Sequence, residues 1–89
     1  MKPSQTERRK EQRSPASGEL WLFVDGPGTL KIEGRLIDFS RNGFRAAHRY
    51  AGMAAGCEVR FRHTGGEGKA RVVWNRILAG SVESGFLIL

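Results

Sequence analysis

Short stretches in which apolar and polar residues alternate fill most of the chain from residue 19 onward, separated by turns that contain glycine. In CEVRFRH, the less polar residues occupy every second position from Cys57 to His63, and the positions between them are charged. Side chains on a strand point alternately to the two faces of a sheet, so this pattern predicts a half-buried strand with Cys57 facing the core. Similar stretches predict about six short strands and no helix of ordinary length, with one or two turns near 48–56 as the only helical candidate.

The stretch TLKIEGRLIDF changes its phase part of the way along. Leu30, Ile32 and Leu36 share one face, whereas Ile37 begins the apolar positions of the other face. Such a slip predicts a twist or bulge near Leu36 and Ile37. Gly34 falls on the first face, where it marks a bulge or a close approach of two backbones.

Asp38 and Ser40 follow this slip, two residues apart and therefore on one face of the strand end. We expect that face to be wet or to bind a ligand. Asn42 and Gly43 then predict a tight turn, with a positive φ that glycine tolerates. Considered alone, Asp38 and Ser40 are equally well explained as caps of this turn through bonds between side chain and backbone.

About six strands in a chain of 89 residues can cover their edges only by curling into a closed sheet. The pattern therefore predicts an all-β fold, a small six-stranded antiparallel β-barrel over residues 18–89. A single cysteine excludes an internal disulfide framework, and with two histidines it gives no zinc-site spacing. An enzyme is the least expected class, because no nucleophile, base and orienting group can be assembled from these residues.

Positive charge is concentrated at the N-terminus. Residues 1–13 hold five basic side chains against Glu7 and Glu11, which leaves three of the six net positive charges there. Residues 2–13 contain no aromatic or branched aliphatic residue, so residues 1–17 are predicted to form a flexible basic arm, either a solubilising tail or an arm that closes on an anion. The arm has no apolar signal region, and LWLFV is far too short for a membrane span, so a cytosolic location is expected.

Two short motifs give a more specific prediction. Arg9 to Arg13 fits R-x-x-x-R just ahead of the first strand, and Asp38 to Gly43 fits D-x-S-x-x-G at the turn after the second. In this order and context they resemble the PilZ domain, and the similarity in strand order extends over nearly the whole chain. The R-x-x-x-R spacing also occurs at Arg41/Arg45, so the place before the first strand, rather than the spacing, selects Arg9 and Arg13.

The resemblance implies a PilZ-like split barrel that binds cyclic di-GMP, a second messenger of the bacterial cytoplasm, without a metal. It implies the ligand-binding residues Arg8, Arg9, Arg13, Asp38, Ser40 and Gly43. Guanidinium groups can fork onto phosphate oxygens or onto guanine O6 and N7, and the Asp38 carboxylate can accept from the N–H donors of a guanine edge. Arg8, just before the first motif arginine, resembles relatives that hold an intercalated pair of ligands. Ordering of the arm on binding is expected to change the surface shown to an effector protein, which the sequence does not identify.

The chain departs from the family pattern in two ways. It ends at Leu89, where many relatives continue into a C-terminal helix, so no such helix is expected, and an apolar patch exposed by its loss would favour self-association; a monomer and a homodimer both stay open. Asn42 stands where a second glycine is common, and asparagine tolerates the same backbone region.

Two other functions remain open. A general nucleic-acid-binding barrel would use the arm and the arginines on phosphates, but Trp21, Phe61 and Trp74 are assigned to the core, which leaves few aromatic rings for stacking. A PilZ-like scaffold that binds no nucleotide would lack the arm arginines, which this chain has.

Overall fold

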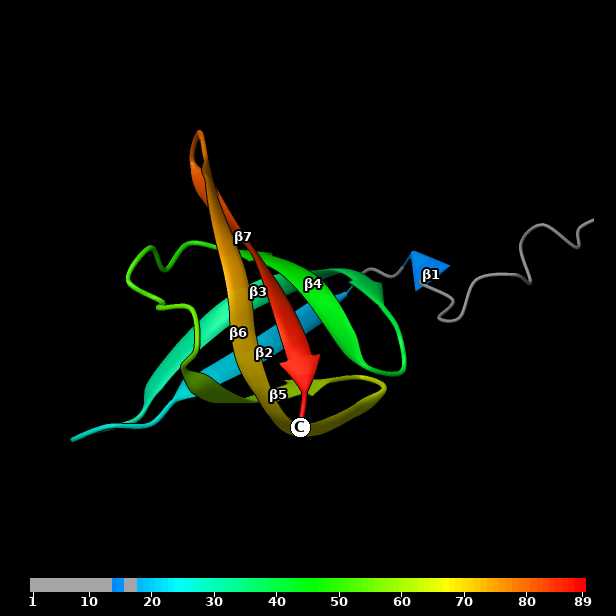
Figure 1. Cartoon of the computed structure of the whole chain (residues 1–89), viewed down its shortest axis with the longest axis horizontal. Helices are drawn as coiled ribbons and strands as arrows, with labels where there is room; N and C mark the ends of the chain where they lie inside the picture. The colour runs from blue at the N-terminus through cyan, green and yellow to red at the C-terminus, as the bar shows by residue number, and fades with distance from the viewer. Residues whose placement is uncertain (1–13, 16–17) are drawn as a thin grey trace, which may run out of the picture.

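A computed structural model describes residues 14–15 and 18–89 of the chain (Figure 1). The strands are β1 (Ser14–Pro15), β2 (Glu19–Val24), β3 (Leu30–Phe39), β4 (Gly43–His48), β5 (Glu58–His63), β6 (Gly66–Leu78) and β7 (Ser81–Ile88). The described residues contain no helix, and the segment 49–57 is a loop. The described residues therefore include no helix that is long and apolar enough to cross a membrane.

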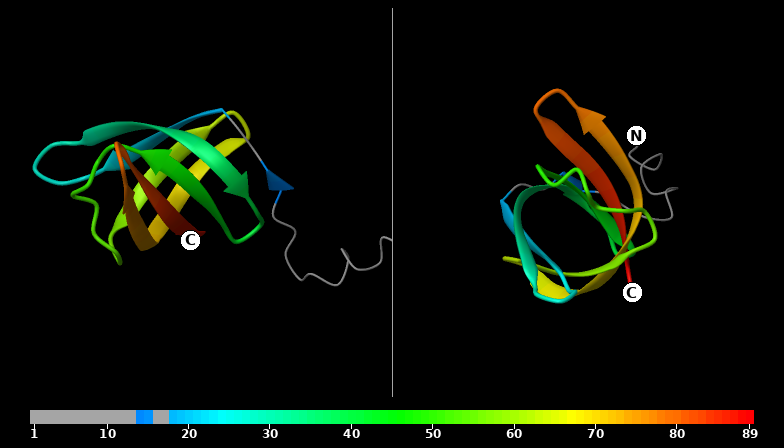
Figure 2. Two further views of the ribbon diagram at one scale, coloured as in Figure 1. Left: turned by 90° about the horizontal axis from the view of Figure 1, so that it is seen from above. Right: turned by 90° about the vertical axis from the view of Figure 1, so that its left-hand side faces the viewer.

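Strands β2 to β7 form the predicted six-stranded antiparallel barrel. Their order around the ring is β3-β2-β5-β6-β7-β4, and pairing of β3 with β4 closes it. The right-hand view of Figure 2 looks into the barrel from one end and shows how the sheet curls on itself. Closure pairs each of these strands on both sides over at least part of its length, which removes most of the exposed edge that a flat sheet of this size would have.

Phe44 lies at the centre of the core and is completely buried. Its ring centroid lies 4.9 Å from that of Phe61 and 4.7 Å from that of Phe86, so strands β4, β5 and β7 meet at one aromatic cluster. Leu20 and Leu22 of β2 are also fully buried, as the alternation in ELWLFV requires.

Two register shifts decide which side chains face inward. The one in β3 lies between Leu36 and Asp38, where the change of phase predicted a bulge. A second lies between Val72 and Trp74 in β6, and no signal in the sequence indicated it. Val73, the extra residue at this shift, is 54% exposed, and Trp74, which follows it, is 36% exposed. The assignment of Trp74 to the core is therefore wrong, because the extra residue re-aims the strand.

Trp21 is also outside the core, although Phe61 is buried as expected. Trp21 alternates with Leu20 and Leu22, which take the inward positions of β2, so its ring lies half-buried on the outer face. The Lys31 ammonium lies 4.3 Å from the centre of this ring. Gly34 marks a close approach of backbones, since a Cβ there would lie 2.9 Å from the Ala47 carbonyl oxygen.

Strand β1 continues the line of β2 along the same edge of β3. Pairing of β2 with β3 extends to Glu19 opposite Arg35, and the Leu36 N–H then donates to the Gly18 carbonyl. Farther along, Pro15 lies opposite Asp38 and Ser14 opposite Phe39. Strand β1 is therefore held against the part of β3 that carries the first residue of D-x-S-x-x-G.

The β6–β7 hairpin extends beyond the barrel wall (Figure 1). Pairing of β5 with β6 ends at Arg71, whereas β6 and β7 remain paired as far as Leu78 and Ser81. The connection is Ala79-Gly80, in which Gly80 takes a φ of +81° that a side chain would disfavour.

Candidate functional site

The hydroxyl of Ser40 is bonded within its own turn. Its Oγ donates to the Gly43 carbonyl (3.1 Å) and accepts from the Gly43 N–H (3.3 Å), and the Ser40 N–H donates to the same carbonyl (2.8 Å). Ser40 is only 3% exposed. These bonds are those of a turn cap, which was one of the two interpretations that the sequence left open.

Gly43 is required for a different reason from the one predicted. Its φ is not positive, so the expectation of a left-handed turn residue is wrong. Instead, a Cβ built at Gly43 would collide with the carbonyl oxygen of Phe86 on β7. The glycine thus lets β4 and β7 approach each other just beyond the turn.

Asp38 is buried rather than wet, and Arg45 on the next strand is one of its partners. The Arg45 Nε donates to Asp38 Oδ2 (2.8 Å), and the Nη2 of the same guanidinium lies 2.6 Å from that oxygen. The Asp38 side chain is 8% exposed and that of Arg45 is 39% exposed. The hydrogen bond that Arg45 donates to Asp38 raises the pKa of Arg45, so the guanidinium stays charged.

This ion pair is part of a chain of charges across four strands. Arg45 Nη1 lies 3.3 Å from Glu83 Oε2 on β7, and Arg76 Nη2 on β6 lies 2.6 Å from Glu83 Oε1. Charges therefore alternate from Asp38 through Arg45 and Glu83 to Arg76. Because Glu83 is also nearly buried, each carboxylate depends on a guanidinium for its compensation.

The same outer face holds an aromatic ring. Across the sheet, Asp38 lies opposite Arg45, Arg45 opposite Gly85, and Gly85 opposite Trp74. A Cβ at Gly85 would collide with the Trp74 indole, so this ring covers the backbone of β7 next to Arg45. The sequence alone did not assign Arg45, Glu83 or Trp74 to the site. The only signal in the sequence was Gly85, a glycine inside a strand, which marks the close contact with the Trp74 ring.

Loss of Arg45 is expected to destabilise the barrel. In Arg45→Met, two nearly buried carboxylates would lose a cationic partner, which should lower the free energy of unfolding by about 1–3 kcal/mol. The matched control is Arg71→Met, because Arg71 pairs with Glu58 on the surface, where both side chains are about half exposed. Urea unfolding should show a change within about 0.5 kcal/mol for the control, and equal losses in both variants would contradict the role of burial.

A second buried polar chain lies one strand position away from the charges. The Ser84 hydroxyl donates to Asn75 Oδ1 (2.6 Å), so the proton between Ser84 and His48 belongs to His48 Nε2 (2.7 Å). His48 Nδ1 accepts from the Tyr50 N–H (3.1 Å), and Asn75 Nδ2 donates to the Met53 carbonyl. The neutral imidazole therefore ties β4, β7, β6 and the 49–57 loop together.

This network predicts weaker folding in mild acid. Burial lowers the pKa of His48 below its usual 6.5, and that of His63 as well. The unfolded chain then binds more protons below pH 6.5, so the free energy of unfolding should fall as the pH drops from about 7 to about 5, by at most about 1.4 kcal/mol per pH unit for each group. Urea unfolding of His48→Asn should show a shallower pH dependence than the wild type, and an unchanged slope would count against the contribution of His48.

An open groove of about 1040 Å³ lies along the middle of β3 and the end of β4. Its lining includes Arg35, Arg49 and Tyr50, together with Glu19 and Glu33. With Lys31, the lining has three basic and two acidic side chains, and the D-x-S-x-x-G residues do not line it. The groove is therefore separate from the site at the end of β3.

Three of the six predicted ligand residues, Arg8, Arg9 and Arg13, lie outside the described residues. The structure brings Asp38, Ser40 and Gly43 together at one turn, where Ser40 and Gly43 are bonded to each other. Within residues 14–15 and 18–89, no group of three or more histidine, cysteine or carboxylate side chains is placed to hold a metal ion.

No protein-family model matches the chain, and no curated protein matches it. Among solved structures, the barrel is similar to that of YcgR from Escherichia coli, crystallised in complex with c-di-GMP, with a TM-score of 0.66 and 18% sequence identity. The alignment covers 92% of this chain and 38% of YcgR, so this chain spans well under half of that protein. The similarity establishes the fold, an all-β barrel of the PilZ-like kind.

Proposed function

We propose that this chain is a c-di-GMP-binding receptor domain of the PilZ kind. The observation that carries the proposal is the position of β1, which sets Pro15 opposite Asp38. Arg13 is bonded directly to Ser14, and neighbouring Cα atoms are about 3.8 Å apart. The last arginine of R-x-x-x-R is thus attached to the strand beside D-x-S-x-x-G, although 25 positions separate Arg13 from Asp38 in the sequence. The likeness of the barrel to YcgR in its complex with c-di-GMP supports this ligand.

The chemistry of each residue suits one part of the nucleotide. Arg8, Arg9 and Arg13 can bind phosphate oxygens or the O6 and N7 atoms of guanine. Asp38 can accept from the guanine N–H donors, because a carboxylate has about four acceptor positions. Ser40 would contribute by shaping the turn and presenting its backbone.

Arg45 and Trp74 extend the proposed site along the outer face. The Arg45 guanidinium is more than one-third exposed beside Asp38, where it can also reach a phosphate. The Trp74 ring of β6 lies over Gly85 of β7, which is opposite Arg45. This ring offers a flat surface on which a guanine can stack. Together they add a cation and an aromatic platform to the residues of the two motifs.

The proposed output is a change in the surface that the domain shows to another protein. When the arm arginines close over the nucleotide, the segment that precedes β1 gains order, and an effector protein distinguishes the two states. The domain acts in this way as a cytoplasmic bacterial adaptor and carries out no catalysis. Arg8 favours two ligand molecules per chain over one.

Calorimetric titration tests the proposal. We expect c-di-GMP to bind, GTP and cyclic di-AMP to bind much more weakly, and Arg9→Ala and Arg13→Ala each to reduce the affinity for c-di-GMP by about tenfold or more. Arg71→Ala is the control, because it removes one positive charge on β6 outside the site. Absence of c-di-GMP binding by the wild-type chain would refute the proposal, and the titration also gives the number of ligands per chain.

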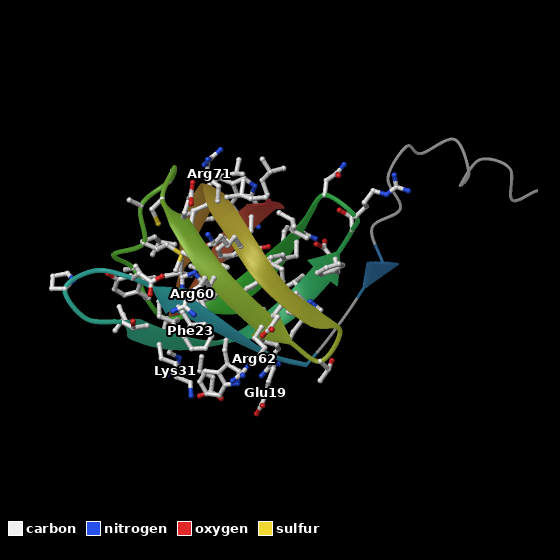
Figure 3. All side chains as sticks on the ribbon, turned by 90° about the horizontal axis from the view of Figure 1, so that it is seen from below. Glu19, Phe23, Lys31, Arg60, Arg62 and Arg71 are labelled. Carbon is white, nitrogen blue, oxygen red and sulfur yellow. The ribbon has the colours of Figure 1, made fainter. Side chains whose placement is uncertain are left out.

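A second candidate is binding of single-stranded nucleic acid, which one observation favours. Phe23 lies on the outer face with Arg60 and Arg62 at 5.1 Å and 5.9 Å from its ring centre, and Figure 3 shows these side chains close together with Lys31. Aromatic rings interleaved with cations form stacking platforms for bases. A short single-stranded DNA in the same titration decides between the candidates, since binding that is steeply salt-dependent and lost in Phe23→Ala would favour this one.

A further inference from the structure

The β6 strand has one open edge in a barrel that is otherwise closed. Its pairing with β5 ends at Arg71, and one further pair of bonds joins Val72 to the backbone of residues 56–57. From residue 73 to residue 78, the strand is paired only with β7. In the described part of the chain, no backbone-to-backbone hydrogen bond reaches the other side of this segment, and the 49–57 loop contacts it through the bond from the Asn75 side chain to the Met53 carbonyl. Open edges of this kind are templates for pairing with another strand.

The backbone geometry shows which groups point away from β7. Leu78 and Ser81 flank a two-residue turn and so form a hydrogen-bonded pair. Alternation along the strand then directs the N–H and C=O of Ile77 and Asn75 toward the open edge. Both donors and acceptors are therefore available to a partner strand.

Exposed apolar side chains gather at this edge. Seven large apolar residues are exposed among the described residues, and they are Leu30, Val73, Trp74, Ile77, Leu78, Leu87 and Leu89. Four of them, Val73, Trp74, Ile77 and Leu78, lie in the open segment of β6, whereas Leu87 and Leu89 lie at the other end of the hairpin, where Leu87 is opposite Gly43 and Arg71. Ile77 is 67% exposed and Val73 54% exposed, and both are β-branched residues suited to a sheet.

We propose that two copies of this chain associate through residues 73–78 of β6, paired antiparallel about a twofold axis. The sequence VWNRIL is self-complementary in this arrangement. With Asn75 on the axis, Val73 lies beside Ile77 of the second copy, and Trp74 lies opposite Arg76. Aromatic and β-branched cross-strand pairs of this kind stabilise sheets, and a cation beside an indole ring is favourable.

The neighbouring register is disfavoured by charge. Twofold antiparallel pairing requires opposed residues to share a face, so the axis must pass through a residue. If it passed through Arg76, the two Arg76 side chains would oppose each other, and Asn75 would face the apolar Ile77. Asn75 on the axis avoids this repulsion and matches apolar residues with apolar ones.

The expected association is weak. Pairing of six residues along a strand edge buries less accessible surface than stable complexes do, which bury at least about 1,200 Å². We therefore expect a dissociation constant on the order of 100 µM. Each chain carries a net charge of +6, so added salt should strengthen the dimer by screening repulsion. This inference does not depend on nucleotide binding.

Sedimentation equilibrium of the full chain without nucleotide tests the proposal, at about 10 µM to 1 mM protein. We expect a monomer–dimer equilibrium that Ile77→Lys weakens at least about tenfold, because the variant places a charge on the edge. The matched control is Leu30→Lys, which replaces an exposed apolar residue on β3, away from the edge, and should leave the equilibrium unchanged.

Amide hydrogen exchange at Asn75 and Ile77 gives an independent measurement on the wild-type chain. Exchange at both should slow as the protein concentration rises, because their N–H groups become donors to the second copy. A wild-type chain that remains monomeric at the highest concentration would overturn the proposal. Equal weakening by Leu30→Lys and Ile77→Lys would also overturn it.

Discussion

Asp38→Asn is expected to weaken c-di-GMP binding by about 100-fold, the largest effect on affinity of any single substitution in the proposed site. In the wild-type chain, the buried carboxylate can accept two N–H donors of one guanine edge. Hydrogen bonds to a charged group contribute about 1.5–3 kcal/mol each, so the loss of this acceptor pair exceeds that of an exposed contact. An amide at position 38 also presents an N–H group to the donors of guanine, which turns attraction into repulsion.

Asp25→Asn provides the control for the change in charge. Asp25 is exposed and paired with Arg60, so the variant alters the net charge by the same amount without touching the site. Its affinity for c-di-GMP should stay within about twofold of the wild type. Affinity for cyclic di-AMP should change little in Asp38→Asn, because adenine lacks the pair of donors that the carboxylate recognises. Equal losses for both nucleotides would indicate a general disturbance of the site.

Gly43→Ala is expected to produce the largest loss of stability, about 2–3 kcal/mol. The added methyl group would occupy the space of the Phe86 carbonyl oxygen, a backbone atom that cannot turn aside. Either β4 moves away from β7 or the turn after β3 distorts, and both weaken the closure of the barrel. For a domain of this size, the melting temperature should fall by roughly 10 °C or more.

Gly28→Ala is the matched control. A Cβ at Gly28 meets no atom within 4 Å, and its φ is not positive, so the unfolding free energy should stay the same or rise by less than about 1 kcal/mol. Urea unfolding of both variants gives the comparison. If Gly43→Ala kept the wild-type stability and lost only c-di-GMP affinity, Gly43 would act by contact with the ligand rather than by strand packing.

Much of the fold follows from the sequence because strand formation leaves a local signal. The period of two in ELWLFV and CEVRFRH identified β2 and β5 and their buried faces. The change of phase after Leu36 located the bulge in β3, since a bulge shifts the apolar positions by one. The small number of residues required a closed sheet, and the ring of six strands confirms it.

The two motifs also identified a turn at which Asp38, Ser40 and Gly43 lie together. Spacing along one strand end is a local property, so the sequence was sufficient for this part. It did not show that Ser40 caps the turn rather than facing solvent, nor that Gly43 serves the packing of β7. The Ser40 bonds stay within its own turn, whereas the role of Gly43 depends on a strand that lies more than 40 positions later in the chain.

Tertiary structure alone decided the partners of the charges and the place of Trp74. Arg45, Glu83 and Arg76 come from three strands, and only the register of the closed barrel aligns them with Asp38. The bulge in β6 turned Trp74 outward although alternation alone placed it in the core. Local pattern thus determined which segments form strands and which faces are apolar, whereas long-range pairing determined which side chains meet, because strand register depends on all neighbours at once.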